Sequence, residues 1–149
     1  MKKQFKLLFA LLAITGLTFA QTPPLETRTL FERLGGTSGI TAIVDDVIEA
    51  HMKNPAISAR FKPYQDQPER FAEIRQHTIQ FFSAGSGGSV EYKGRDMPTT
   101  HQGMNISATE YMCVIDDIMG VLGKHNIDDE SKKDVLAILW SLKDIIISK

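Results

Sequence analysis

The sequence is short of cysteine, of metal-ligand spacings and of basic charge. Cys113 is the only cysteine among 149 residues, which excludes an internal disulfide. The four histidines form neither a His-x-x-x-His nor a Glu-x-x-His pair, so the helical spacings of zinc and di-iron sites are missing. Lysines and arginines number 17 against 18 acidic residues, and three of those lysines precede residue 7. This balance provides no basic field for nucleic acid.

Long apolar runs are also missing, apart from one at the N-terminus. A basic start is followed by the apolar run Leu7 to Phe19, which is too short to span a bilayer. Small residues at Thr18 and Ala20 suit cleavage by signal peptidase. We therefore expect a signal peptide at 1–20, and a periplasmic or secreted protein with no stable membrane span after cleavage. The alternative is a retained N-terminal anchor helix.

The remaining chain is long enough for one domain with one core. A short linker is expected at 21–27 and the domain at 28–149. No run alternates convincingly like a strand, whereas several apolar stripes have the spacing of helices. One stripe comprises Ile40, Ile43, Val44, Val47 and Ile48, and the last one comprises Val135, Leu136, Leu139, Leu142 and Ile146. The sequence predicts an all-α fold with four substantial helices.

Local signals predict where several of these helices begin. Thr37 or Ser38 can cap the helix that carries the first stripe. Pro68 suits the first turn of the next long helix. Ser107 and Glu110 have the spacing of a capping box. Asn126 or Asp128 precedes the last helix.

Residues 89–106 form an unusually long connection for a compact domain, and segments of this kind are often functional. Pro98 can open one helical turn there, and this turn would carry His101. His77 lies on or beside the apolar stripe of the preceding helix. A haem needs a nitrogen ligand, apolar walls and one edge open to water. The candidate walls are Ile48, Phe61, Ile74, Phe81, Met97 and Met104.

Several short motifs, in order, are similar to those of group I truncated haemoglobins. The segment Leu30 to Gly36 reads Leu-Phe-Glu-Arg-Leu-Gly-Gly, and Phe81-Phe82 precedes a further Gly-Gly. The most specific part is Tyr92-Lys-Gly-Arg-Asp-Met97 followed by His101. The resemblance extends from about Leu30 to the C-terminus, which is most of the chain.

The resemblance implies a two-over-two helical sandwich that binds haem b without covalent attachment. His101 would be the proximal iron ligand. His77 would be either a distal hydrogen-bond donor or a sixth ligand that a gas can displace. Phe61 would pack on the haem face. Thr78, with Ile48 and Ile74, would line the distal pocket. Lys93, Arg95 and His51 are candidates for contact with the haem propionates.

Two positions depart from the family pattern. Ile48 stands where the family usually has a tyrosine, and Thr78 stands where it often has a glutamine. Both usual residues hydrogen-bond the gas ligand, and isoleucine cannot. High oxygen affinity and efficient nitric-oxide dioxygenation are therefore not expected. A nitric-oxide dioxygenase or peroxidase-like side activity stays open for what is primarily a ligand-binding haem protein.

Three functions remain open from the sequence. The first is an exported haem b protein that binds O2, NO or CO. The second is a bis-histidine haem protein for electron transfer. A reductase is a possible partner that the sequence does not identify. The third is a helical binding module without haem, in which His77 and His101 are structural.

Overall fold

The computed structural model describes residues 27–148, and this part of the chain is helical with no strand. The predicted signal peptide and all but Thr27 of the predicted linker lie outside the described residues. The helices, in chain order, are α1 (Leu30–Arg33), α2 (Gly36–Lys53), α3 (Ser58–Phe61), the 3-10 helix η2 (Lys62–Tyr64), α4 (Pro68–Gly85), α5 (Met97–His101), α6 (Ala108–Lys124) and α7 (Asp129–Ile146). Within the range 27–148, no helix is long and apolar enough to cross a membrane.

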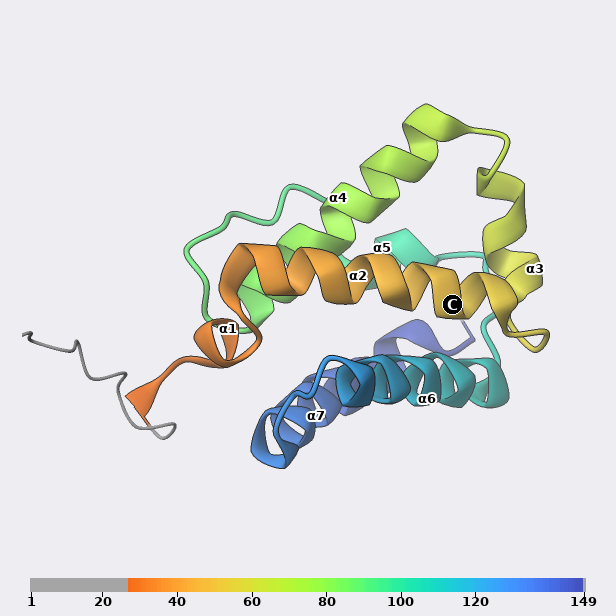
Figure 1. The fold of residues 1–149 in the computed structure, drawn as a ribbon. Helices are drawn as coiled ribbons and strands as arrows, with labels where there is room; N and C mark the ends of the chain where they lie inside the picture. The colour runs from red at the N-terminus through yellow and green to blue at the C-terminus, as the bar shows by residue number, and fades with distance from the viewer. Residues whose placement is uncertain (1–26, 149) are drawn as a thin grey trace, which may run out of the picture.

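The four long helices form two pairs. α2 packs against α4, α6 packs against α7, and the pairs meet where α2 crosses α6. Figure 1 shows α2 and α4 above α6 and α7, with the short α5 behind α2. The predicted all-α, two-over-two arrangement is therefore confirmed.

The long helices begin where local chemistry favours a start, with one exception. Ser107 and Glu110 form the predicted capping box at α6, and Asp128 caps α7 by accepting from the Ser131 backbone N–H at 2.9 Å. Pro68 occupies the first turn of α4. The prediction for α2 was wrong, because this helix already begins at Gly36 and has no side-chain cap. Gly35, with a φ of 86°, provides the turn into it.

The core lies between the two layers. Its most buried large side chains come mainly from one face each of α2 and α6, and they are Ile40, Val44, Val121 and Leu122, with Ile57 nearby. Ile40 and Val44 belong to the predicted apolar stripe of α2. Leu136 of α7, predicted to point inward, is 37% exposed and shares the outer surface with Trp140, which is 53% exposed. The ammonium group of Lys143 lies 4.6 Å from the centroid of the indole ring.

Arg60 connects the short helix α3 to α6 through hydrogen bonds. Its guanidinium donates to both carboxylate oxygens of Glu110, at 2.8 and 3.2 Å, and also to the Met104 carbonyl at 2.7 Å. Because Glu110 also accepts from the Ser107 backbone N–H and hydroxyl, one carboxylate fixes both a helix start and a neighbouring element. These hydrogen bonds lower the pKa of Glu110 from 4.5 to about 2.

Gly39 and Gly120 provide a matched test of the packing. A Cβ at Gly39 would overlap the Leu34 carbonyl oxygen, whereas one at Gly120 would meet nothing. We expect Gly39→Ala to lower the free energy of unfolding by about 1–3 kcal/mol, since backbone must move. Gly120→Ala should raise it by about 0.5–1 kcal/mol through helix propensity. Chemical denaturation of both variants measures the difference, and equal effects would contradict this packing.

The Glu110 carboxylate predicts a specific loss of stability in acid. Its folded-state pKa is depressed, so its contribution is complete above about pH 4.5 and is lost as the pH falls toward about 2. We expect Glu110→Gln to lower the melting temperature at about pH 6, and the gap from the wild type to narrow toward about pH 3. Glu130→Gln, which alters an exposed carboxylate on α7, is the control. A gap that stays constant with pH would refute the assignment.

Candidate functional site

His101 is the last residue of α5, a helix of only five residues. The Asp96 carboxylate caps its start by accepting from the Thr99 backbone N–H at 2.8 Å, and Pro98 lies in the first turn. Gly103, with a φ of 79°, follows the end of the helix. The predicted single turn carrying His101 is therefore present.

The ring of His101 is held by its own helix. Its Nδ1 lies 2.8 Å from the Met97 carbonyl oxygen. Because a carbonyl only accepts hydrogen bonds, Nδ1 carries the proton and Nε2 keeps its lone pair. A hydrogen bond of this kind is the usual second interaction of a histidine that ligates a metal. The half-buried ring of His101 can therefore present Nε2 to an iron.

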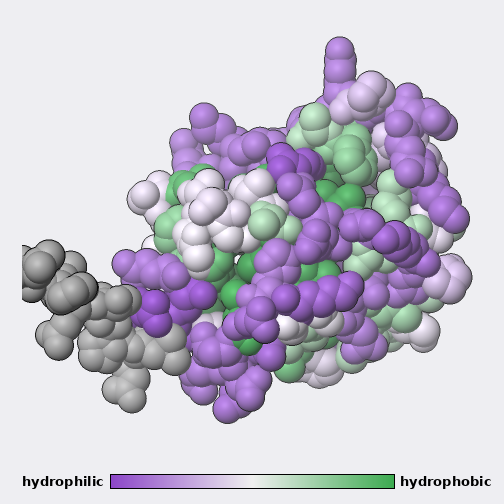
Figure 2. Space-filling view, viewed as in Figure 1, coloured by the Kyte–Doolittle hydropathy of each residue, from purple (hydrophilic) through white to green (hydrophobic). Residues whose placement is uncertain are grey.

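The predicted wall residues lie at the borders of the core and are half-buried. These residues are Ile48 of α2, Phe61 of α3, Ile74, Thr78 and Phe81 of α4, Met97 of α5, and Met104, which follows α5. Of these, Ile48 and Met97 also pack directly against the buried core cluster. Figure 2 shows hydrophobic side chains reaching the surface among hydrophilic ones on the face where the two layers meet. Apolar surface left half-covered in this way suits contact with a flat apolar group.

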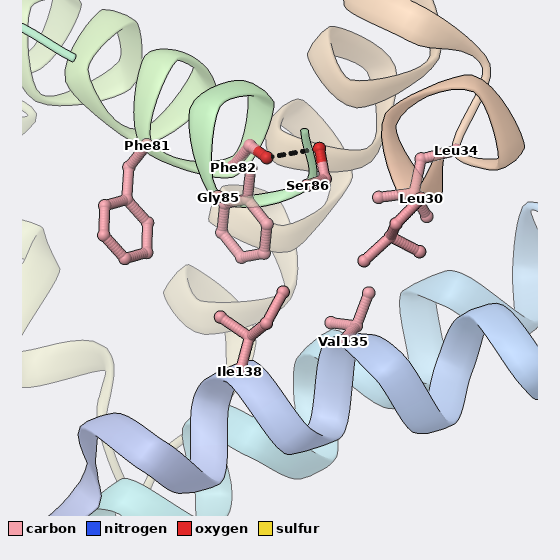
Figure 3. A pocket seen from close by; sticks show the side chains of 8 residues that line it. All are labelled: Leu30, Leu34, Phe81, Phe82, Gly85, Ser86, Val135 and Ile138. Atoms are coloured by element: carbon pink, nitrogen blue, oxygen red, sulfur yellow. Dashed lines mark hydrogen bonds between the residues drawn. The ribbon is translucent and has the colours of Figure 1, made fainter. Parts of the chain in front are cut away.

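A small apolar pocket marks where α4 faces α7. Figure 3 shows Phe81 and Phe82 pointing from α4 toward Val135 and Ile138 of α7. Leu30, Leu34, Gly85 and Ser86 complete the lining. Of these residues, only Phe81 was predicted as a site residue. The signal for the others was the Phe-Phe pair and the three-residue spacing of Val135 and Ile138, which indicate a shared helix face without saying what it covers.

His77 lies on α4 beside the segment that leads to α5. The centroid of its half-buried ring is 6.2 Å from that of the Tyr92 ring, which meets it edge-on. The Tyr92 ring also meets the Phe81 ring edge-on, with the two centroids 5.5 Å apart. The Tyr92 hydroxyl donates to the Arg95 carbonyl at 2.7 Å, which fixes the loop. Tyr92 therefore connects the segment that carries His101 with the helix that carries His77.

The two departures from the family pattern leave few hydrogen-bond donors among the residues predicted for the distal side of the haem. The Thr78 hydroxyl donates to the Ile74 carbonyl of its own helix at 2.9 Å, so its proton is already used. Ile48 has no polar atom. Among Ile48, Ile74, Thr78 and His77, which were predicted for the distal side, His77 is the one whose side chain can still donate a hydrogen bond.

His51, one of the candidates for contact with a haem propionate, is largely buried and bound to a carboxylate. Its side chain is 7% exposed, and its Nδ1 lies 2.9 Å from Oδ2 of Asp117. Burial lowers the pKa of His51 more than the hydrogen bond and charge of Asp117 raise it, so the ring is neutral at neutral pH. Lys93 and Arg95 are both exposed, as a contact with charged groups at an open edge requires.

These residues fit a haem as a set. His101 supplies one nitrogen with a free lone pair, and half-buried apolar side chains come from four different helices. Exposed cations lie on the loop just before α5. Nothing in this donor set favours another metal, since none of the residues 27–148 forms a cluster of three histidine, cysteine or acidic side chains.

The proteins that resemble this chain in sequence include group 1 truncated haemoglobins. A family model described as bacterial-like globin matches residues 29–148. The group 1 truncated haemoglobin LI410 of Chlamydomonas moewusii is 23% identical over 121 residues, covering 80% of this chain and 68% of that protein. The group 1 truncated haemoglobin GlbN of Nostoc sp. is 22% identical over 121 residues, covering 81% of this chain and 98% of that protein.

Solved structures show the same fold. The Fe(III) form of truncated haemoglobin from Tetrahymena pyriformis superimposes with a TM-score of 0.75 at 20% identity, covering 82% of this chain and all of that one. The group II truncated haemoglobin of Bacillus anthracis gives 0.70 at 20% identity, covering 87% of this chain and 95% of that one. With the family model matching almost every described residue, and with a histidine and apolar walls that suit the cofactor, this chain belongs to the bacterial-like globin family, and its cofactor is haem b.

Proposed function

We propose that this globin is an exported truncated haemoglobin of group I that binds a diatomic gas, with Nε2 of His101 as the proximal iron ligand and His77 as a displaceable sixth ligand. The hydrogen bond between His101 Nδ1 and the Met97 carbonyl carries the proposal, because it fixes the tautomer that ligation needs. Haem supplies an iron with one further position at which O2, CO or NO can bind.

The chain's own residues then have separate tasks. His101 orients the cofactor from α5, and the short helix keeps the imidazole plane fixed through Met97. Half-buried side chains such as Ile74 and Phe81 exclude water from the cofactor faces. Lys93 and Arg95 offer their charges to the propionates at the open edge.

The distal side supports weak rather than strong retention of oxygen. Ile48 cannot donate a hydrogen bond, and the Thr78 hydroxyl already donates to Ile74. If His77 occupies the sixth position, a gas must displace it, and apparent affinity falls with the fraction of open molecules. The pronounced nitric-oxide dioxygenase activity that a strong oxygen complex would support is not part of this proposal.

Export is supported by the N-terminal sequence. A basic start, an apolar run of signal-peptide length and small residues at the expected cleavage point precede the domain. Cell fractionation with N-terminal sequencing tests this part of the proposal. A protein that starts near Gln21 and leaves the cytoplasm supports export, and one that keeps Met1 contradicts it.

A bis-histidine electron carrier is the second candidate. The shortage of hydrogen-bond donors around Ile48 and Thr78 favours it, because an electron carrier does not need to hold a gas. A reductase or other redox partner would then be required. Fast binding of carbon monoxide to the ferrous protein, measured by flash photolysis, would favour the gas-binding proposal over this one.

His101 is tested by its effect on the haem spectrum. We expect wild-type protein to give a Soret band after reconstitution, and His101→Ala to shift or lose it because the proximal nitrogen is gone. Added imidazole should restore the wild-type spectrum to His101→Gly. His125→Ala, which breaks a surface pair with Asp46, serves as the control. An unchanged spectrum for His101→Ala would exclude His101 as the ligand.

His77 is tested separately in both oxidation states. As a sixth ligand, it should give a six-coordinate, low-spin wild-type spectrum, and His77→Ala should convert this spectrum to a high-spin one. Carbon monoxide should also bind His77→Ala faster, since no ligand has to leave first. Identical ferric and ferrous spectra in the two proteins would show that His77 is not bound to iron.

A further inference from the structure

The side chain of His51 is a buried titratable group that the proposed mechanism does not use. It is located in the last turn of α2 and its residue is 5% exposed. Its Nδ1 donates to Oδ2 of Asp117 on α6 at 2.9 Å. Basic side chains in the last turn of a helix interact favourably with its C-terminal end, whereas His51 points inward onto a carboxylate.

Asp117 also fixes the corner that follows α2. The Asn54 side-chain amide donates to both oxygens of Asp117, at 3.0 and 3.1 Å. Asn54 is the C-cap of α2, and its side-chain oxygen accepts from the Ala56 backbone N–H at 3.1 Å. Its carbonyl accepts from the Ser58 N–H, the first residue of α3, at 2.8 Å. One carboxylate therefore anchors the turn between α2 and α3.

Phe61, at the end of α3, lies on the ring of His51. The two ring centroids are 5.0 Å apart and the planes differ by 25°, which is a stacked arrangement. The imidazole therefore covers one face of a phenyl ring that is half-buried overall. Offset stacking of this kind fixes the plane of a side chain as well as its position.

We propose that His51 is a positioning residue that holds the plane of Phe61 against the haem face, with Asp117 and Asn54 holding His51 in turn. This inference rests on the proposed placement of Phe61 on the haem. In effect, Asp117 on α6 sets the orientation of an aromatic group on α3 that contacts the cofactor from the other layer of the molecule.

The chemistry of histidine suits this role. A phenylalanine at this position could stack on Phe61, but it could not bind Asp117, so its ring would be free to rotate. An asparagine could bind Asp117, but it has no ring to stack. His125 provides an internal comparison, because its Nε2 binds Asp46 on α2 at 2.7 Å and it has no aromatic ring contact among residues 27–148.

The experiment measures the rate at which the ferric holoprotein loses haem to excess apomyoglobin. The variants are His51→Ala, His51→Phe, Asp117→Asn, Phe61→Leu and the double variant of His51→Ala with Phe61→Leu. His125→Ala is the control, since it removes a histidine–carboxylate pair between the same two helices. Proton NMR of the cyanide-bound ferric protein records the shifts of the haem methyl groups, which respond to the plane of a neighbouring ring.

His51→Ala is expected to speed haem loss by about three- to tenfold, the range that one aromatic stacking contact provides. Asp117→Asn should move the haem methyl shifts in the same direction as His51→Ala does. His51→Phe should lose haem more slowly than His51→Ala, because its ring can still stack on Phe61. The double variant should lose haem no faster than Phe61→Leu, because His51 acts only through Phe61. His125→Ala should leave rate and shifts unchanged.

The inference is overturned if His51→Ala and His125→Ala behave alike, or if the effects of His51→Ala and Phe61→Leu simply add. Should His51→Ala fail to fold, Asp117→Asn with unchanged methyl shifts would overturn it as well. Failure of the proposed function is distinguishable, since it requires that His101→Ala leave the haem spectrum unchanged. A normal His101 result with silent His51 and Asp117 variants rejects the positioning role alone.

Discussion

The hydrogen bond between the His101 ring and the Met97 carbonyl is the contact on which the cofactor side of the molecule depends. It joins the first and last residues of one short helix, so the orientation of the imidazole is set almost entirely within five residues. This locality explains why the flanking connection can be long and irregular. Loop residues such as Tyr92 and Asp96 need only place the short helix, and the helix itself orients the His101 ring.

The opposite side of the site is held by contacts that are distant in sequence. α3 has four residues and little apolar surface, yet two polar connections fix it on α6. Arg60 reaches Glu110, and the corner before α3 is bound to Asp117 through Asn54. Phe61 directly follows Arg60 at the end of α3 and stacks on His51. A short element thus gains a defined position from charged and amide groups where hydrophobic burial alone would be too weak.

The parts of the fold that were predictable are those that depend on local spacing. The apolar stripes, Pro68 and the Ser107–Glu110 pair each act within one or two turns, and the structure confirms them. The errors concern tertiary contacts. Leu136 continues a stripe but points to solvent. The partner of His51 was likewise not predictable, since Asp117 lies 66 residues away. At the site, the helical turn with His101 was predictable, whereas the partners of Phe81 on α7 were not.

The exposure of Trp140 has a practical consequence for spectroscopy. It is the only tryptophan in the chain, and more than half of its side chain already contacts water in the folded state. Its emission maximum will therefore change little on unfolding. However, α7 packs on α5, which carries His101, and a helix is only about 10 Å across. If His101 ligates the haem as proposed, an indole this close to the porphyrin would transfer its excitation efficiently, and the intensity of tryptophan fluorescence would report how much of the globin carries its cofactor.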